Sequence, residues 1–171
     1  MHFQSPAVAL VPLLRAAMRA GYKAAPSGIA RKILDDRKFI LMLNDLPTSG
    51  LLPDGRRVHR PYETSWWLTD DTIFYGNVSL RHELTPETER FSGHIGYAVH
   101  PEHQGKGLGT RLLQHGLQQA KIIGLPKVLL TIDVDNVASC RVAEKCGAIL
   151  QDTIYHPYKP GTPHRRYWIT F

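Results

Sequence analysis

The chain has 171 residues, 43% of them hydrophobic and 21% charged, so it can bury one substantial core and fits one domain better than two. No uninterrupted apolar run approaches the about 20 residues that a helix needs to cross a bilayer, which excludes a membrane-spanning helix. The formal net charge of +6 favours anionic partners, and nucleic acid, acidic lipid surfaces and polyphosphate cofactors all qualify.

The two cysteines, Cys140 and Cys146, lie six residues apart in a segment with helical periodicity. Their side chains should fall on different faces, so we expect no disulfide and a reducing compartment, the cytoplasm. The residues before Asp35 include basic but no acidic side chains, a bias that organellar presequences also show. The same segment also fits an ordinary amphipathic surface helix.

The N-terminal third predicts helices and a loop. Residues 8–11 indicate a short strand, 13–22 a helix, and 29–44 a second helix that ends before Pro47. Residues 48–61 are typical of a loop.

From Ser65 the pattern changes to β-rich runs, which predict three consecutive antiparallel strands at 65–69, 72–81 and 93–100. A helix at 106–123 follows, with leucines at core spacing, and then a buried strand at 127–133.

Asn136 suits a helix N-cap, residues 137–146 suit a short helix, and Gly147 stands where a left-handed C-cap would lie. Two strands at 148–155 and 165–171 close the chain.

The most informative stretch is GYAVHPEHQGKGLGTRLL, in which an apolar strand stops at Pro101 and a helix begins within a glycine-rich turn. Backbone amides from Gly105 to Thr110 can point at a phosphate there, where the helix dipole also favours negative charge. A pyrophosphate is therefore the expected guest, and Lys106 and Arg111 add positive charge nearby. The alternative is that the glycines only form a tight turn.

Two nucleotide motifs fail against this turn. A P-loop needs Gly, Lys and then Ser or Thr, but Gly107 follows Lys106. A dinucleotide fingerprint needs GxGxxG, whereas this turn is GxGxG and lacks the acidic residue about twenty positions on.

The remaining pattern is QxxGxG, formed by Gln104, Gly107 and Gly109, and it resembles the signature turn of the GNAT acetyltransferases. The upstream GHIGYAVHP resembles the strand of that family that pairs with the pantetheine arm. The downstream NVASCRVAEKCGA resembles its later motif, in which the matching positions are Asn136, Ser139, Lys145 and Gly147. The resemblance covers residues 63–171, and earlier residues match only in the order of elements.

The resemblance implies a single α/β (α+β) domain over residues 1–171, with a mixed, mostly antiparallel twisted sheet, helices on both faces and splayed central strands. It implies transfer of an acetyl group from acetyl-CoA to a primary amine, in which an amide near Tyr97 to Val99 polarises the thioester carbonyl. The residues expected to contact acetyl-CoA are Tyr97, Val99, Gln104, Gly105, Lys106, Gly107, Leu108, Gly109, Thr110, Asn136 and Ser139.

For the chemistry, His94 lies where relatives often carry a catalytic carboxylate, and an imidazole titrates near about 6.5, so it is the first candidate for general base. A packed structural histidine is the alternative, and Glu83, with His82 beside it, is the second candidate base. Many relatives place a tyrosine acid seven residues after Asn136, but this chain has Ala143 there. We therefore expect no essential side-chain acid on that helix.

His100 and His103 flank the turn, but no cysteine or third histidine is spaced to complete a metal site, so no metal is expected. The amine acceptor cannot be identified, and a homodimer is left open. Two other functions stay open: a non-catalytic acyl-CoA-binding module, and a nucleic-acid-binding domain, which the scattered basic residues do not favour.

Overall fold

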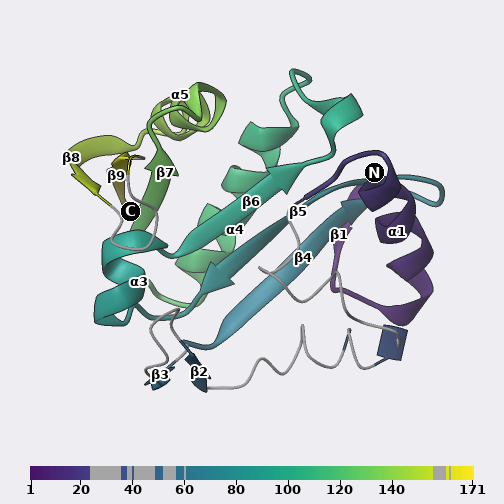
Figure 1. Ribbon diagram of the computed structural model, residues 1–171, viewed down its shortest axis with the longest axis horizontal. Coiled ribbons are helices and arrows are strands. Elements are labelled where there is room, and N and C mark those ends of the chain that lie inside the picture. Colours follow the sequence, from purple (N-terminus) through teal and green to yellow (C-terminus); the bar gives the residue numbers. More distant parts are fainter. Residues whose placement is uncertain are drawn as a thin grey trace.

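The computed structural model describes residues 1–23, 36, 37, 40, 49–51, 57–59, 61–155, 161 and 163–171. Figure 1 shows the arrangement of these residues, with two sheets in the middle and helices on either side. The predicted helix at 29–44 lies almost entirely outside the described residues. Among the helices that are described, none combines the length and the apolar character needed to cross a membrane.

The first sheet has four strands in the order β1-β4-β5-β6, all antiparallel. They are β1 (His2–Gln4), β4 (Glu63–Thr69), β5 (Phe74–Arg81) and β6 (Ile95–Val99). The three consecutive strands predicted from the sequence are confirmed. The sequence did not predict β1, because three residues are too few to show a period of two.

The second sheet has three strands in the order β7-β9-β8, also antiparallel. They are β7 (Lys127–Asp133), β8 (Ile149–Tyr155) and β9 (Pro163–Thr170), which confirms the last three predicted strands.

The predicted loop at 48–61 is wrong in part. Two short strands, β2 (Ser49–Leu51) and β3 (Arg57–His59), pair there as an antiparallel hairpin. Each strand has three residues, which are too few for an alternation of apolar and polar residues to be recognised in the sequence.

The two sheets meet through β6 and β7 at one point. An isolated bridge joins Gly93 to Leu130, and the His94 amide donates to the Leu129 carbonyl over 2.7 Å. Beyond this junction the two strands are not paired, and Figure 1 shows β7 turning away from β6 toward α5. We call this divergence the splay. It leaves backbone groups of both strands without a partner strand.

The helical segments of the described chain are η1 (Val8–Leu10), α1 (Val11–Arg19), α3 (Pro86–Phe91), η2 (Pro101–His103), α4 (Leu108–Ile122) and α5 (Val137–Lys145). The predicted strand at 8–11 is wrong, because these residues enter the first helix. Pro12 stands in the first turn of α1, where proline's fixed φ suits a helix, and Val11, Leu14 and Ala17 form its buried face.

The polar segment at 82–92 indicated only a connection between two strands, but α3 lies within it. The structure shows a capping box, in which the Thr85 hydroxyl accepts from the Thr88 amide and the Thr88 hydroxyl accepts from the Thr85 amide. Pro86 follows at the first helical position. This Thr-Pro pair is the sequence signal that could have predicted α3.

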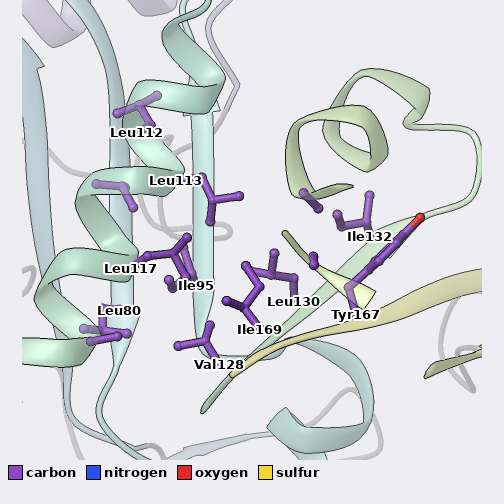
Figure 2. Packing of buried hydrophobic residues seen from close by; sticks show 14 of the residues in the cluster. Leu80, Ile95, Leu112, Leu113, Leu117, Val128, Leu130, Ile132, Tyr167 and Ile169 are labelled. Carbon is purple, nitrogen blue, oxygen red and sulfur yellow. The ribbon is translucent and has the colours of Figure 1, made fainter. Parts of the chain in front are cut away.

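Helices cover both faces of the first sheet. α1 packs with Trp67, Phe74 and Tyr22 in one cluster, and α4 packs on the other face. Figure 2 shows Leu113 and Leu117 of α4 with Ile95, facing Val128 and Leu130 of β7. The core under α4 is therefore continuous across the splayed strands and holds the two sheets in place.

Candidate functional site

The glycine-rich turn leads into the N-terminus of α4. Gly107 is the N-cap residue and has a left-handed backbone with φ 78°, and Gly105 has φ 74°. The first helical hydrogen bond runs from the Arg111 amide to the Gly107 carbonyl over 3.2 Å. Helix geometry therefore leaves the amides of Leu108, Gly109 and Thr110 without acceptors inside the helix, and they form an anion site at its positive end.

The three glycines of the turn differ in their backbone requirements. A Cβ atom on Gly105 or Gly107 would meet no protein atom within 4 Å, so their positive φ angles, and not crowding by the protein, call for glycine. A Cβ atom on Gly109 would lie 3.4 Å from Val142 and 3.6 Å from Tyr97. These are ordinary van der Waals distances, so the protein around Gly109 has room for a Cβ atom. Gly105 and Gly107 are the glycines that the backbone of the turn requires.

The polar side chains near the turn are held by the protein backbone. Lys106 Nζ donates to the Glu102 carbonyl over 3.1 Å, which folds this side chain back over the turn. Arg111 donates to the Met1 carbonyl over 3.1 Å, so it anchors the N-terminus. Arg111 was predicted to add positive charge near a pyrophosphate, and to contact the pyrophosphate directly it would have to leave the Met1 carbonyl.

The backbone of β6 turns alternate peptide groups toward the splay. The His100 amide donates to the Tyr75 carbonyl of β5 over 2.8 Å, so His100 faces β5. Because successive residues of a strand face opposite ways, the peptide groups of Val99 and Tyr97 face the splay. Gln104 Nε2 lies 3.4 Å from the Val99 carbonyl, a long contact that a stronger ligand hydrogen bond could replace.

The other side of the splay is formed by β7 and the start of α5. Asn136 Oδ1 accepts from the Ser139 amide over 3.1 Å and caps α5, as predicted from the sequence. Ser139 is half-buried, whereas Ala143 is completely buried in the main core. The small Ala143 therefore brings α5 close to its neighbours and offers no polar group.

Two buried hydroxyls flank the splay, Tyr97 on β6 and Thr131 on β7. Neither has a hydrogen-bond partner in the described part of the chain. Buried polar groups are usually satisfied, so such atoms often indicate that a ligand or water completes the site. Tyr97 was predicted from the sequence to contact acetyl-CoA, whereas no role was predicted for Thr131.

His94 is buried at the junction of the two sheets. Its Nδ1 accepts a hydrogen bond from the Leu129 amide over 2.9 Å, so the ring proton is on Nε2. Burial, with Arg81 and Lys127 nearby, lowers the pKa of His94 to about 4. A ring whose acceptor nitrogen is used and whose cationic form is disfavoured is poorly suited to take a proton from an amine.

The second candidate base lies just beyond β5. Glu83 is exposed, and its neighbour His82 is held by Thr64, whose hydroxyl lies 2.9 Å from His82 Nε2. Arg81 in the same segment donates to the Gly93 carbonyl over 3.1 Å. The segment with Glu83 thus starts at the closed end of the splay.

The structure adds a carboxylate to the two histidines that flank the turn. One ligand atom each from His100, Glu102 and His103 lies within 4.8 Å of the others, and Glu102 was not among the residues considered from the sequence. However, His100 Nδ1 accepts from the Glu102 amide over 3.2 Å and caps η2. That bond fixes the ring proton on Nε2, so His100 could bind a metal only by giving up the cap or its proton.

Comparison with known proteins decides the family. The sequence model of the acetyltransferase (GNAT) family matches residues 37–148. The chain belongs to the GNAT acetyltransferase family. This assignment to a family of enzymes disfavours both the non-catalytic acyl-CoA-binding module and the nucleic-acid-binding domain.

Similar proteins support this assignment. N-alpha-acetyltransferase 30 of Schizosaccharomyces pombe is 31% identical over 111 residues, which are 64% of this chain and 73% of that protein. A mycothiol acetyltransferase of Nocardiopsis dassonvillei is 42% identical over 67 residues, 38% of this chain and only 20% of that protein.

Solved structures confirm the predicted fold. A chimera of the spermidine N-acetyltransferase SpeG from Vibrio cholerae and hSSAT superposes with a TM-score of 0.66 at 18% identity, covering 99% of this chain and 94% of that chain. The structure of yncA from Salmonella typhimurium with its cofactor acetyl-CoA gives 0.63 at 15% identity, covering 99% and 92%.

Proposed function

We propose that this acetyltransferase moves the acetyl group of acetyl-CoA to a primary amine, which attacks the thioester directly while both substrates are bound. One observation carries the proposal: the anion site at the start of α4 lies beside the splay, where β6 presents unpaired peptide groups. A pyrophosphate and an amide-bearing arm attached to it need these two features side by side. The acetyl-CoA bound to yncA supports the choice of donor.

In this proposal the pyrophosphate binds the amides that follow Gly107, and the pantetheine arm extends along β6. Val99 pairs with an amide of the arm and gives up its long contact with Gln104. The thioester carbonyl then accepts a hydrogen bond from a β6 amide that faces the splay. Such backbone donors are already in place before the reaction, which is the source of their catalytic effect.

The amine must be neutral when it attacks, so a base has to take its proton. The geometry of His94 weighs against it, and we propose Glu83, the exposed carboxylate just after β5. A positioned general base contributes typically 10² to 10⁴-fold, so Glu83→Gln should lower kcat/KM by a factor in this range with CoA affinity unchanged. Glu87→Gln on α3 is the matched control, and equal activity of both variants would leave the deprotonation to solvent.

The experiment that tests the function is a screen of amines with acetyl-CoA, in which a thiol reagent reports free CoA. The panel should include peptides with free N-termini, amino acids and polyamines, because the similar proteins include acetyltransferases named for such acceptors. We expect CoA release that depends on the amine, together with an N-acetyl product of the matching mass. Release without an amide product, or no release with any amine, would contradict the proposal.

We also propose that residues 1–171 form one acetyltransferase domain. The solved SpeG structure supports this, because the superposition covers 99% of this chain. SpeG has been solved as a dodecamer, so the oligomeric state should be measured together with activity.

A further inference from the structure

The strand β6 has one side chain with a strong hydrogen-bond donor. From Ile95 to Val99 the sequence is IGYAV, so the hydroxyl of Tyr97 is the only polar side-chain group that this strand offers. The Tyr97 ring lies against α4, since a Cβ atom on Gly109 would be 3.6 Å from its Cε2 atom. The tyrosine side chain therefore points to the face of the first sheet that α4 covers.

The Tyr97 hydroxyl lies near α5. Ser139, Cys140 and Cys146, in α5 and at its C-terminal end, are near enough to Tyr97 to influence its pKa. α5 follows β7 directly and packs against β7 and α4. A Cβ atom on Gly109 would lie 3.4 Å from Val142 of α5 and 3.6 Å from Tyr97, so the Tyr97 ring lies where β6, α5 and the first turn of α4 meet. This place borders the splay, where an acyl-CoA arm would lie.

The position along the strand is also favourable. The splay closes at Gly93 and His94, so an arm that enters from the glycine-rich turn must place its reactive end before that point. Tyr97 is three residues from His94, or about 10 Å at the rise of a strand. Its hydroxyl is buried without a hydrogen-bond partner among the described residues, although Ser139 is close enough to influence it.

We propose that the Tyr97 hydroxyl donates a hydrogen bond to the sulfur of the CoA leaving group and stabilises the thiolate as the C–S bond breaks. This inference rests on the proposed function. The amine nitrogen forms the new bond to the acyl carbon, the electron pair of the broken C–S bond stays on sulfur, and the amine proton goes to the base. The Tyr97 proton stays on its oxygen, so all atoms and charges balance.

The acidities explain why the proton is not transferred. Burial raises the pKa of Tyr97 above the ordinary tyrosine value, with a smaller opposing effect from Ser139. A thiol ionises near about 8.5, so the phenol is a weaker acid than the CoA thiol. Tyr97 is therefore a hydrogen-bond donor to the thiolate, which makes it a catalytic residue in the sense that it contacts a reacting atom.

The test is the pKa of the CoA thiol in the enzyme complex, followed by the ultraviolet absorbance of the thiolate. A hydrogen bond to a charged group should lower this pKa by about one unit, a tenfold effect, relative to the Tyr97→Phe variant. The same variant should lose about tenfold in kcat and keep its CoA affinity. Tyr167→Phe is the matched control, because it also removes a buried hydroxyl that contacts α5, through Glu144, and should leave the thiol pKa unchanged.

A second measurement needs no variant. The affinity of wild-type protein for CoA should rise as the thiol ionises, whereas the affinity for desulfo-CoA should not follow that pH dependence. Equal thiol pKa values in wild type and Tyr97→Phe, or equal pH dependence for CoA and desulfo-CoA, would overturn the role of Tyr97. Failure of wild-type protein to bind CoA at all would instead overturn the proposed function.

Discussion

His94 can have a structural role, as the acceptor at the junction of the two sheets, or a catalytic role, as the general base. The variants His94→Asn and His94→Ala separate these two roles. The Nδ1 atom of His94 accepts from the Leu129 amide, and the adjacent backbone bond joins the two sheets. Asparagine can place its Oδ1 near that nitrogen, so His94→Asn keeps the acceptor but cannot act as a base. His94→Ala leaves a buried amide without a partner, which costs about 1–3 kcal/mol in addition to the cavity.

The contribution of His94 to the pH dependence of stability follows from its lowered pKa. Burial, Arg81 and Lys127 lower the pKa of His94 to about 4, so the unfolded chain binds more protons than the folded chain between that value and the unfolded pKa near about 6.5. Stability from this group is present above the unfolded pKa and is lost as the pH falls through the window toward the folded pKa. Between pH 7 and pH 5 the loss should be about 2 kcal/mol, with each full unit worth about 1.4 kcal/mol.

The assay is urea unfolding of wild type and His94→Asn at pH 7 and pH 5, with kcat/KM measured at pH 7. We expect His94→Asn to keep kcat/KM within about threefold of wild type. Between pH 7 and pH 5 its free energy of unfolding should fall by about 2 kcal/mol less than that of wild type. An activity loss of 10²-fold or more with intact CoA affinity would restore His94 as the general base. An unchanged pH dependence of stability would refute the buried neutral histidine.

Three further variants test the packing and the chemistry. Gly93→Ala should lower the free energy of unfolding by about 2 kcal/mol or more, because its φ is 65° and a Cβ atom would lie 2.5 Å from the Leu129 carbonyl oxygen; wild-type stability in urea would contradict this. Gly116→Val should cost about 1–3 kcal/mol, since its Cβ would be 3.0 Å from a β5 side chain, and an unchanged thermal midpoint would speak against it. The double variant Ser139→Ala with Cys140→Ala should lose less than tenfold in kcat across pH at saturating acetyl-CoA, and a greater loss, above about 1.4 kcal/mol of barrier, would show an essential donor on α5.

Much of the C-terminal half could be predicted from the sequence. The bounds of β7 were predicted as they are, and the predicted α4 and α5 end within two residues of the observed helices. The reason is that these elements carry both a periodic apolar face and explicit end signals, such as Asn136 at the N-cap and the left-handed Gly147 after α5. Local chemistry was enough to specify them.

The errors lie where local signals were ambiguous. The apolar run at 8–11 fits a strand or a helix entry equally well, and only the packing of Val11 and Leu14 against the sheet decides for the helix. The partner of His94 could not be predicted, because Leu129 lies 35 residues further along the chain. The same holds for Tyr97, whose side chain gains its surroundings from α4 and α5.

The central claim, that the turn before α4 binds acetyl-CoA, has a direct test by calorimetric titration of CoA into two glycine variants. Gly107 and Gly124 lie at opposite ends of α4, with φ angles of 78° and 80°, and a Cβ atom on either would meet no protein atom within 4 Å. Valine therefore imposes the same backbone strain at both positions, but only at Gly107 does it cover the amides of the anion site. We predict that Gly107→Val abolishes CoA binding with a native circular dichroism spectrum, while Gly124→Val binds like wild type. Wild-type affinity in Gly107→Val would contradict the account.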